Sequence, residues 1–268
     1  MGMLNKRLCF TINQHRTLDE IRSYRSLLTS GLYQGIEIFY PYDTDTLHQD
    51  DYRKGIFELC EEHPEVVLHL PFGKDNDLCC LESANITQKR LIDAINYGKQ
   101  FHVKKYTLHL GYTREQDRGM LYNHLLPLIR QLCDATKAFI MIENMPKETE
   151  MGVSPEEIKA FIDQSERSNL SFIFDTGHAN LSGYTIRDYM KFLYPYLMHM
   201  HLSDNRGEKD EHKPIGTGTV DFKTLIDETR HYSHLYCLEI IYQTNEDLQD
   251  YARAFHRLLD ETTFSFIV

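Results

Sequence analysis

The feature that most constrains this chain is a regular alternation of short apolar runs with longer amphipathic segments. Parallel strands are buried on both faces and need a crossover connection, so apolar runs that alternate with helical segments predict a parallel sheet. Eight such runs are predicted as strands, at residues 9–13, 35–40, 66–70, 106–110, 139–142, 172–174, 197–202 and 236–241.

Local signals predict a helix after each of these strands. Thr17 and Glu20 have the spacing of a capping box, in which the threonine caps the helix and the glutamate reaches back to it. Ser154 and Pro155 combine a capping residue with proline at the first helical position. The predicted helices begin near residues 17, 51, 86, 115, 154, 186, 222 and 245.

Eight strand-helix units within 268 residues predict the α/β class and, more narrowly, a closed (β/α)8 TIM barrel. A doubly wound open sheet is the alternative that the same alternation allows. No stretch has the composition of a linker, so residues 1–268 are expected to form a single domain.

The composition of the chain limits the kinds of molecule that it is expected to bind. The chain has 29 Lys and Arg against 40 Asp and Glu, and its formal net charge of −11 argues against a broad surface for polyanions. The six cysteines form no C-x-x-C pair and are expected to be reduced core thiols. No apolar run approaches the roughly 18 residues of a membrane span, and the first residues lack a hydrophobic signal core. We therefore expect a cytoplasmic protein without a membrane partner.

Side chains that can bind a metal stand at the ends of six predicted strands. The carboxyl ends of barrel strands gather on one face, so residues far apart in sequence become neighbours there. Burying several carboxylates together costs several kcal/mol for each unpaired charge, and a divalent cation would supply the missing positive charge. Nitrogen and oxygen donors together suit zinc, manganese, iron or cobalt better than calcium. The strand-end residues are His69, His109, Glu143, Asp175 with His178 beyond it, His201 with Asp204 beyond it, and Glu239.

The segment after the seventh strand adds an Asp210-x-His212 pair, which is interpreted as part of a second or third metal site or as a solvated loop. Gly216-Thr-Gly218 lacks the third glycine of a dinucleotide fingerprint and is expected to bring amides to a phosphate or to shape a turn. His199 is expected to point away from His201 and to be structural.

The motifs at these strand ends make the whole chain resemble the xylose-isomerase-like TIM barrel superfamily. That superfamily joins sugar and sugar-phosphate isomerases and epimerases to the endonuclease IV family, also called AP endonuclease family 2. The motifs are His-Leu-Pro-Phe at 69–72, His-Leu-Gly at 109–111, Ile-Glu-Asn at 142–144, Asp-Thr-Gly-His at 175–178, His-Leu-Ser-Asp at 201–204, Asp-x-His at 210–212 and Leu-Glu at 238–239.

The two branches imply different metal sets. The isomerase and epimerase branch implies one metal, with His178 and Arg206 holding the substrate and four ligands: Glu143, Asp175, His201 and Glu239. The endonuclease branch implies three zinc ions and nine ligands, all present here: His69, His109, Glu143, Asp175, His178, His201, Asp210, His212 and Glu239. The expected cofactor is therefore Zn²⁺ or Mn²⁺, with one to three ions.

Two enzymatic hypotheses follow. The first is an isomerase or epimerase of a small sugar, polyol or sugar phosphate, in which the metal stabilises an enediolate while Glu143 and Glu239 transfer the proton. The alternative is an AP endonuclease that hydrolyses phosphodiesters at abasic DNA sites, and only this alternative requires a nucleic acid partner. The loop at residues 41–45 is acidic where DNA contacts are expected, which favours the first hypothesis. A non-catalytic, metal-dependent sugar binder is a third class.

Overall fold

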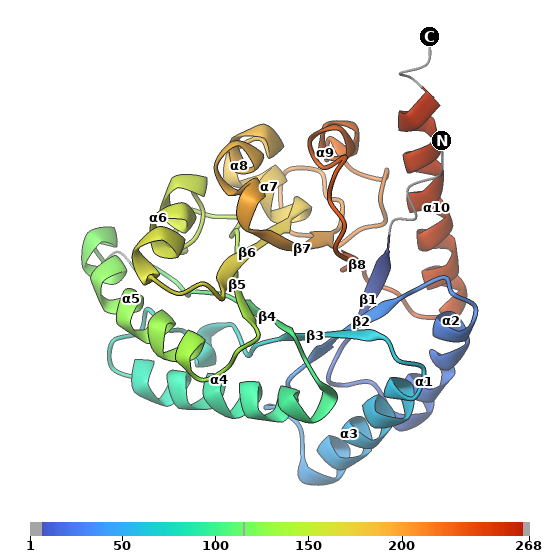
Figure 1. Ribbon diagram of the computed structural model, residues 1–268, viewed down its shortest axis with the longest axis horizontal. Coiled ribbons are helices and arrows are strands. Elements are labelled where there is room, and N and C mark those ends of the chain that lie inside the picture. Colours follow the sequence, from blue (N-terminus) through green and yellow to red (C-terminus); the bar gives the residue numbers. More distant parts are fainter. Residues whose placement is uncertain (1–6, 115, 265–268) are drawn as a thin grey trace.

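The computed structural model describes residues 7–114 and 116–264, and these fold into a closed parallel barrel surrounded by helices (Figure 1). Each strand pairs in parallel with the next along the chain. In order, the strands are β1 (Leu8–Ile12), β2 (Gly35–Phe39), β3 (Glu65–His69), β4 (Lys105–Leu108), β5 (Phe139–Glu143), β6 (Leu170–Asp175), β7 (Leu197–Leu202) and β8 (Tyr236–Leu238).

Pairing between β8 and β1 closes the barrel, and Cys9 lies opposite Cys237 in this pair. The predicted TIM barrel is thereby confirmed, and the doubly wound alternative is wrong because an open sheet has two free edges. The strand ends differ slightly from prediction: β4 stops at Leu108 and β8 at Leu238, so that His109 and Glu239 follow their strands instead of ending them.

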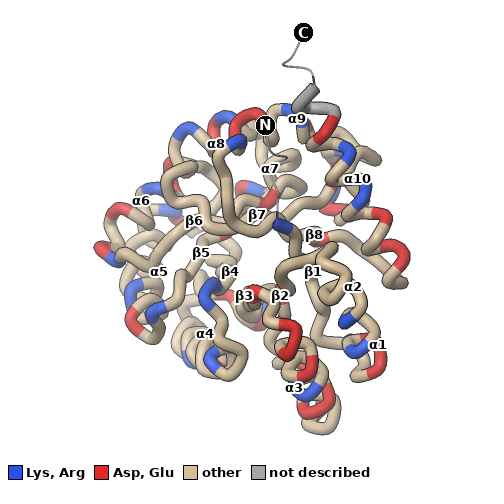
Figure 2. The backbone as a smooth tube through the Cα atoms, turned by 45° about the vertical axis from the view of Figure 1, so that its right-hand side comes forward, with Lys and Arg blue, Asp and Glu red and all other residues tan. Residues whose placement is uncertain are grey.

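The helices cover the outside of the barrel. They are α1 (Leu18–Ser23), α2 (Arg25–Thr29), α3 (Thr46–Cys60), α4 (Ala84–Gly98), α5 (Arg118–Asp134), α6 (Pro155–Ser165), α7 (Thr176–Ser182), α8 (Ile186–Leu193), α9 (Phe222–Glu228) and α10 (Asn245–Phe264), with short 3₁₀ turns at Lys74–Asn76, Lys99–Phe101 and Tyr194–Tyr196. Figure 2 shows acidic and basic positions next to one another along the outer helices, for example on α3 and α10.

Capping signals predicted where helices begin better than apolar periodicity predicted how long the helices are. The Thr17 and Glu20 capping box is present, and Ser154 caps α6 with Pro155 at its first turn. The first predicted helix is instead two helices, α1 and α2, which meet at Tyr24.

Helix α7 is absent from the sequence prediction. It starts directly at the end of β6, where the Asp175 carboxylate accepts the backbone N–H of His178 at 2.6 Å. Gly183, at a φ of +82°, ends the helix in the left-handed conformation that glycine adopts without strain. Seven residues are too few for an apolar period to show, which is why the prediction missed it.

The main core lies between the barrel and its helices, and a second, smaller apolar cluster lies within the barrel. The latter consists of Cys9, Val67, Met141, Ile173, Leu235 and Cys237. All six cysteines are free thiols, as expected. Across the described part of the chain, no helix combines the length and apolar character needed to cross a membrane.

Candidate metal centre

Four of the predicted ligands form a compact group at the mouth of the barrel, the face where the carboxyl ends of the strands lie. One donor atom from each lies within 4.8 Å of the others. His201 Nδ1 is 3.0 Å from Glu143 Oε1 and 3.0 Å from Glu239 Oε2. Three of the four side chains are buried and Glu239 is 15% exposed, so the group faces the open end of the barrel. Its members are Glu143, Asp175, His201 and Glu239.

A second compact group shares Glu143 with the first. Glu143 Oε2 is 2.8 Å from His109 Nε2 and 3.5 Å from His69 Nε2, and the three donor atoms lie within 4.8 Å of one another. Glu143 therefore presents one carboxylate oxygen to each group.

The remaining three predicted ligands lie next to these groups but are more spread out. Asp210 Oδ2 is 3.3 Å from His178 Nε2 and 2.9 Å from His212 Nε2. Within residues 7–114 and 116–264, these three side chains do not form a group with all donor atoms within 4.8 Å.

Backbone carbonyls fix the orientation of three of the histidines. His69 Nδ1 lies 2.9 Å from Leu70 O, and His178 Nδ1 lies 2.9 Å from Asn144 O. His212 Nδ1 makes the same contact, at 2.9 Å, with the carbonyl of Glu239. Because a carbonyl accepts only, each ring donates from Nδ1 and presents an unprotonated Nε2 when neutral. Metal-binding histidines are commonly held in this way.

The electrostatics of the mouth fit a bound cation. Burial, opposed by the charge of His178 and reinforced by the charges of Glu143 and Glu239, raises the pKa of Asp175 to about 7. Burial also acts to raise the pKa of Glu143, but the neighbouring imidazoles His201 and His109 outweigh it, so that this pKa lies well below its usual range. Asp175 Oδ2 is buried and has no hydrogen-bond partner among the described residues. A buried carboxylate oxygen without a hydrogen bond, 3.8 Å from His201 Nδ1 and among other nitrogen and oxygen donors, fits a divalent cation.

Arg206, which the resemblance assigned to substrate binding, is exposed in the loop after β7. Its backbone N–H donates to Glu211 Oε2 at 3.1 Å. The side chain takes no part in the contacts that join the nine predicted ligands.

Asp204 shapes the loop that carries Asp210 and His212. Its Oδ2 accepts the backbone N–H groups of Gly216 and Gly218, at 2.9 and 2.8 Å. Of the two roles expected for Gly216-Thr-Gly218, shaping the turn is therefore confirmed, because a carboxylate already occupies the amides that a phosphate would need.

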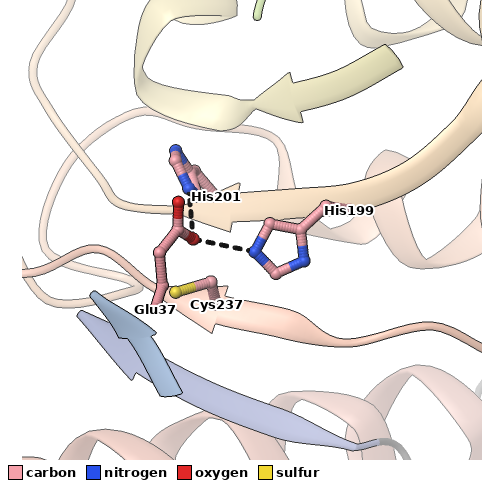
Figure 3. Close-up of side chains that lie close together, drawn as sticks. All are labelled: Glu37, His199, His201 and Cys237. Carbon is pink, nitrogen blue, oxygen red and sulfur yellow. Dashed lines mark hydrogen bonds and ion pairs between the residues drawn. The ribbon is translucent and has the colours of Figure 1, made fainter. Parts of the chain in front are cut away.

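The expected direction of His199 is wrong, and Glu37 was missed. Residues two apart in a strand share a face, so His199 and His201 both point into the barrel, where both contact the carboxylate of Glu37 (Figure 3). The signal for Glu37 was present in the sequence, because an acidic residue inside the otherwise apolar stretch of β2 needs a buried partner.

Comparison with known proteins agrees with this architecture. A probable endonuclease 4 of Malacoplasma penetrans is 28% identical over 177 residues, which are 60% of this chain and 61% of that relative. An uncharacterized protein of Methanocaldococcus jannaschii is 27% identical over 188 residues, or 66% of this chain and 64% of the relative. The chain thus spans less than two thirds of the length of these relatives.

Solved structures share the fold at low identity. A D-tagatose 3-epimerase-like protein has a TM-score of 0.79 at 20% identity, covering 96% of this chain and 99% of that chain. An AP endonuclease of family 2 from Brucella melitensis has a TM-score of 0.69 at 15% identity, covering 90% of this chain and 96% of that chain.

A family match that covers most of the sequence shows to which family the chain belongs. Residues 27–261 match the family described as the xylose isomerase-like TIM barrel. Its members are isomerases, epimerases and endonucleases, and they typically bind divalent metals. This protein belongs to the xylose isomerase-like TIM barrel family.

Proposed function

We propose that this protein is a divalent-metal-dependent isomerase or epimerase of a small sugar, polyol or sugar phosphate. The observation that carries the proposal is the compact group at the mouth, in which Glu143 and Glu239 approach one point from β5 and from the end of β8. These strands are separated by β6 and β7 around the barrel. Two carboxylates that reach one point from different directions suit epimerisation, because a proton must leave one face of a carbon and return to the other.

In this proposal the four residues of the compact group hold the cation: Glu143, Asp175, His201 and Glu239. When bound, a divalent cation there supplies polarisation of adjacent hydroxyl and carbonyl oxygens. Glu143 and Glu239 accept and return the carbon-bound proton, and His178 holds a substrate hydroxyl. The assignment of Arg206 to substrate binding stays a prediction.

An aromatic side chain next to the predicted ligands supports the proposal that the substrate is a small sugar. The ring of Phe72 packs against His69 and His109, with centroid distances of 4.8 and 4.9 Å. An aromatic face next to convergent polar groups is typical of small-molecule sites, where the apolar surface packs on the ligand and the polar groups fix its orientation.

The proposal is tested by proton exchange. We expect the zinc- or manganese-loaded protein to incorporate solvent deuterium into at least one of D-tagatose, D-allulose and L-ribulose, measured by NMR in deuterated water. Glu143→Gln should lower this rate by about 100-fold or more, since it removes a general base. Glu65→Gln is the matched control, because Glu65 begins β3 at the opposite end of the barrel. Full turnover by Glu143→Gln on every accepted sugar would contradict the assignment.

A second candidate function is phosphodiester hydrolysis at abasic DNA sites. It is favoured by the presence of all nine ligands of the endonuclease branch, with His69 and His109 sharing Glu143 and with Asp210 between His178 and His212. In that reading the nine residues would hold clustered zinc ions, and these would supply activation of a water molecule and stabilisation of the leaving oxygen.

Metal counting and an incision assay distinguish the two candidates. About one ion per chain, together with deuterium exchange, supports the isomerase. Three ions per chain, together with cleavage of a duplex that contains a single abasic site, would replace it with the endonuclease. The same duplex without the abasic site is the control for unspecific nuclease activity.

A further inference from the structure

We propose that Glu37 of β2 is a positioning residue for the metal centre, which holds the His201 ring so that Nδ1 faces the cation. The inference rests on the proposed function, because it requires a metal ion in the compact group. It adds β2, which supplies none of the nine predicted ligands, to the strands that build the site.

The contacts of Glu37 are all made inside the barrel. Glu37 Oε2 is 2.8 Å from His201 Nε2 and 2.9 Å from His199 Nε2, and both contacts are drawn in Figure 3. Oε1 accepts the hydroxyl of Thr107 at 2.9 Å. All four side chains are fully buried, so water does not replace any of these bonds.

These contacts require a carboxylate at position 37. Three groups point at it, two ring nitrogens and one hydroxyl, and an ionised carboxylate can accept from all three. The acceptor therefore selects the protonated form of Nε2 on His201. A glutamine could offer only one acceptor oxygen and would turn an N–H₂ donor toward a protonated ring nitrogen or the hydroxyl.

The consequence falls on the other nitrogen of the same ring. With Nε2 protonated, a neutral His201 carries its lone pair on Nδ1, which lies 3.0 Å from both Glu143 Oε1 and Glu239 Oε2. His69, His178 and His212 are oriented the opposite way round, by backbone carbonyls at Nδ1. His201 is held by a side chain, so its orientation can be tested by substitution.

His199 supports the same carboxylate. Its Nε2 shares Glu37 Oε2 with His201, so the carboxylate has two imidazole partners in a fully buried place. A buried carboxylate that lost its partners would be costly, and the second imidazole helps to keep Glu37 in place whether or not a cation is bound at the mouth.

Cys237 lies close enough to Glu37, His199 and His201 to suggest another arrangement. One donor atom each of Glu37, His199, His201 and Cys237 lies within 4.8 Å of the others. A cation there would take the place of the hydrogen bonds and leave His201 bridging two ions. Hydrogen bonding accounts for the Glu37 contacts without removing a proton from either ring, so we assign these contacts to hydrogen bonds.

The test compares the zinc affinity of Glu37→Gln with that of the wild type, by competition with a chromophoric chelator. We expect the variant to bind zinc 10- to 100-fold more weakly, the range for losing an outer partner of a metal-binding histidine. The matched control is Glu65→Gln, the same substitution at a carboxylate that begins β3 at the opposite end of the barrel, where it pairs with Lys105 and Arg7. The control should bind zinc within about twofold of the wild type.

A second measurement does not depend on the folding of the variant. In the ¹⁵N NMR spectrum of the zinc-loaded wild type, His201 should show a metal-bound Nδ1 and a protonated, slowly exchanging Nε2. Coordination through Nε2, or an unchanged zinc affinity in a folded Glu37→Gln variant, would overturn the inference.

The outcomes separate this inference from the proposed function. If the wild type binds zinc tightly and Glu37→Gln binds it equally well, the positioning role alone is wrong. If the wild type binds no divalent metal, both proposals fail. A tightly bound zinc equivalent that is lost in Cys237→Ser would place a cation among Glu37, His199, His201 and Cys237 and overturn the hydrogen-bond assignment.

Discussion

Replacing Asp204 by asparagine should loosen the loop that carries Asp210 and His212 while leaving the barrel folded. Asp204 binds this loop through four backbone N–H groups. Oδ2 accepts from Gly216 and Gly218, at 2.9 and 2.8 Å, whereas Oδ1 accepts at 2.9 and 3.1 Å from the N–H groups of Asn205 and Val220.

The size of the effect follows from this count. Asparagine keeps one acceptor oxygen, so in either orientation of its amide two of the four N–H groups lose their acceptor. Each unsatisfied buried donor costs about 1–3 kcal/mol, and partial access of water to these bonds places the sum at about 2–4 kcal/mol. For a chain of this size that is a fall in Tm of roughly 4–7 °C, or local opening of the loop where opening costs less.

Thermal unfolding and limited trypsin digestion together check this prediction. Arg206 and Lys209 are exposed in the loop, so local opening should speed cleavage there. Asp247→Asn is the control, because Asp247 also accepts two backbone N–H groups, from Gln243 and Thr244, but at the exposed start of α10. The control should leave cleavage of the loop unchanged.

One result would refute the reasoning. If Asp204→Asn melts within about 1 °C of the wild type and is cleaved at the same rate, the four contacts do not hold the loop. The zinc affinity of the variant adds a functional readout. A loosened loop should lower the affinity for any ion bound by Asp210 and His212, whereas the compact group at the mouth should keep its affinity.

Three further predictions concern the metal and the barrel. Removal of metal with EDTA should lower the Tm by roughly 5 °C, because a cation at about 100 times its Kd adds about 2.7 kcal/mol. Zinc or manganese should restore the Tm, and an unchanged melting curve would contradict a bound metal. The pKa of Glu65 is lowered because the charges of Lys105 and Arg7 outweigh its burial, so its contribution to stability is present above about pH 4.5 and is lost as pH falls through the lower folded pKa. Urea unfolding should therefore show a deficit for Glu65→Gln at pH 7 that shrinks below pH 4.5, and a constant deficit would contradict this. Gly35→Ala should destabilise the protein by about 1–3 kcal/mol in urea, since its Cβ would lie 2.8 Å from the Glu65 carbonyl and 2.6 Å from Leu235 Cδ1; equal stability would show that the barrel wall yields at this point.

Much of the fold could be predicted because its signals are local. The capping box at Thr17 and the proline after Ser154 are read from neighbouring residues, and the buried parallel strands show as apolar runs. The break at Tyr24 and the short α7 could not be read in this way. Two half-length helices have too few turns to show a period, and α7 is held at its start by the Asp175 carboxylate at the end of a strand.

The nine predicted ligands lie at or next to the mouth because barrel topology brings strand ends together whatever their separation in sequence. What the sequence did not yield were the contacts between them. The sharing of Glu143 between two groups depends on side-chain conformation, and the partners of Glu37 come from β4 and β7, at 70, 162 and 164 residues along the chain. Such pairings follow from three-dimensional register, which no spacing in the sequence encodes.

The position of Glu143 between two groups of ligands affects the order and the affinity with which cations would bind. Because one oxygen faces the compact group of four and the other faces His69 and His109, an ion in either place draws on the same negative charge. The second ion therefore meets a carboxylate that the first has already partly neutralised, and like charges held a few ångströms apart repel. A zinc titration should accordingly proceed in two unequal steps, with the affinity of the second lowered by the first.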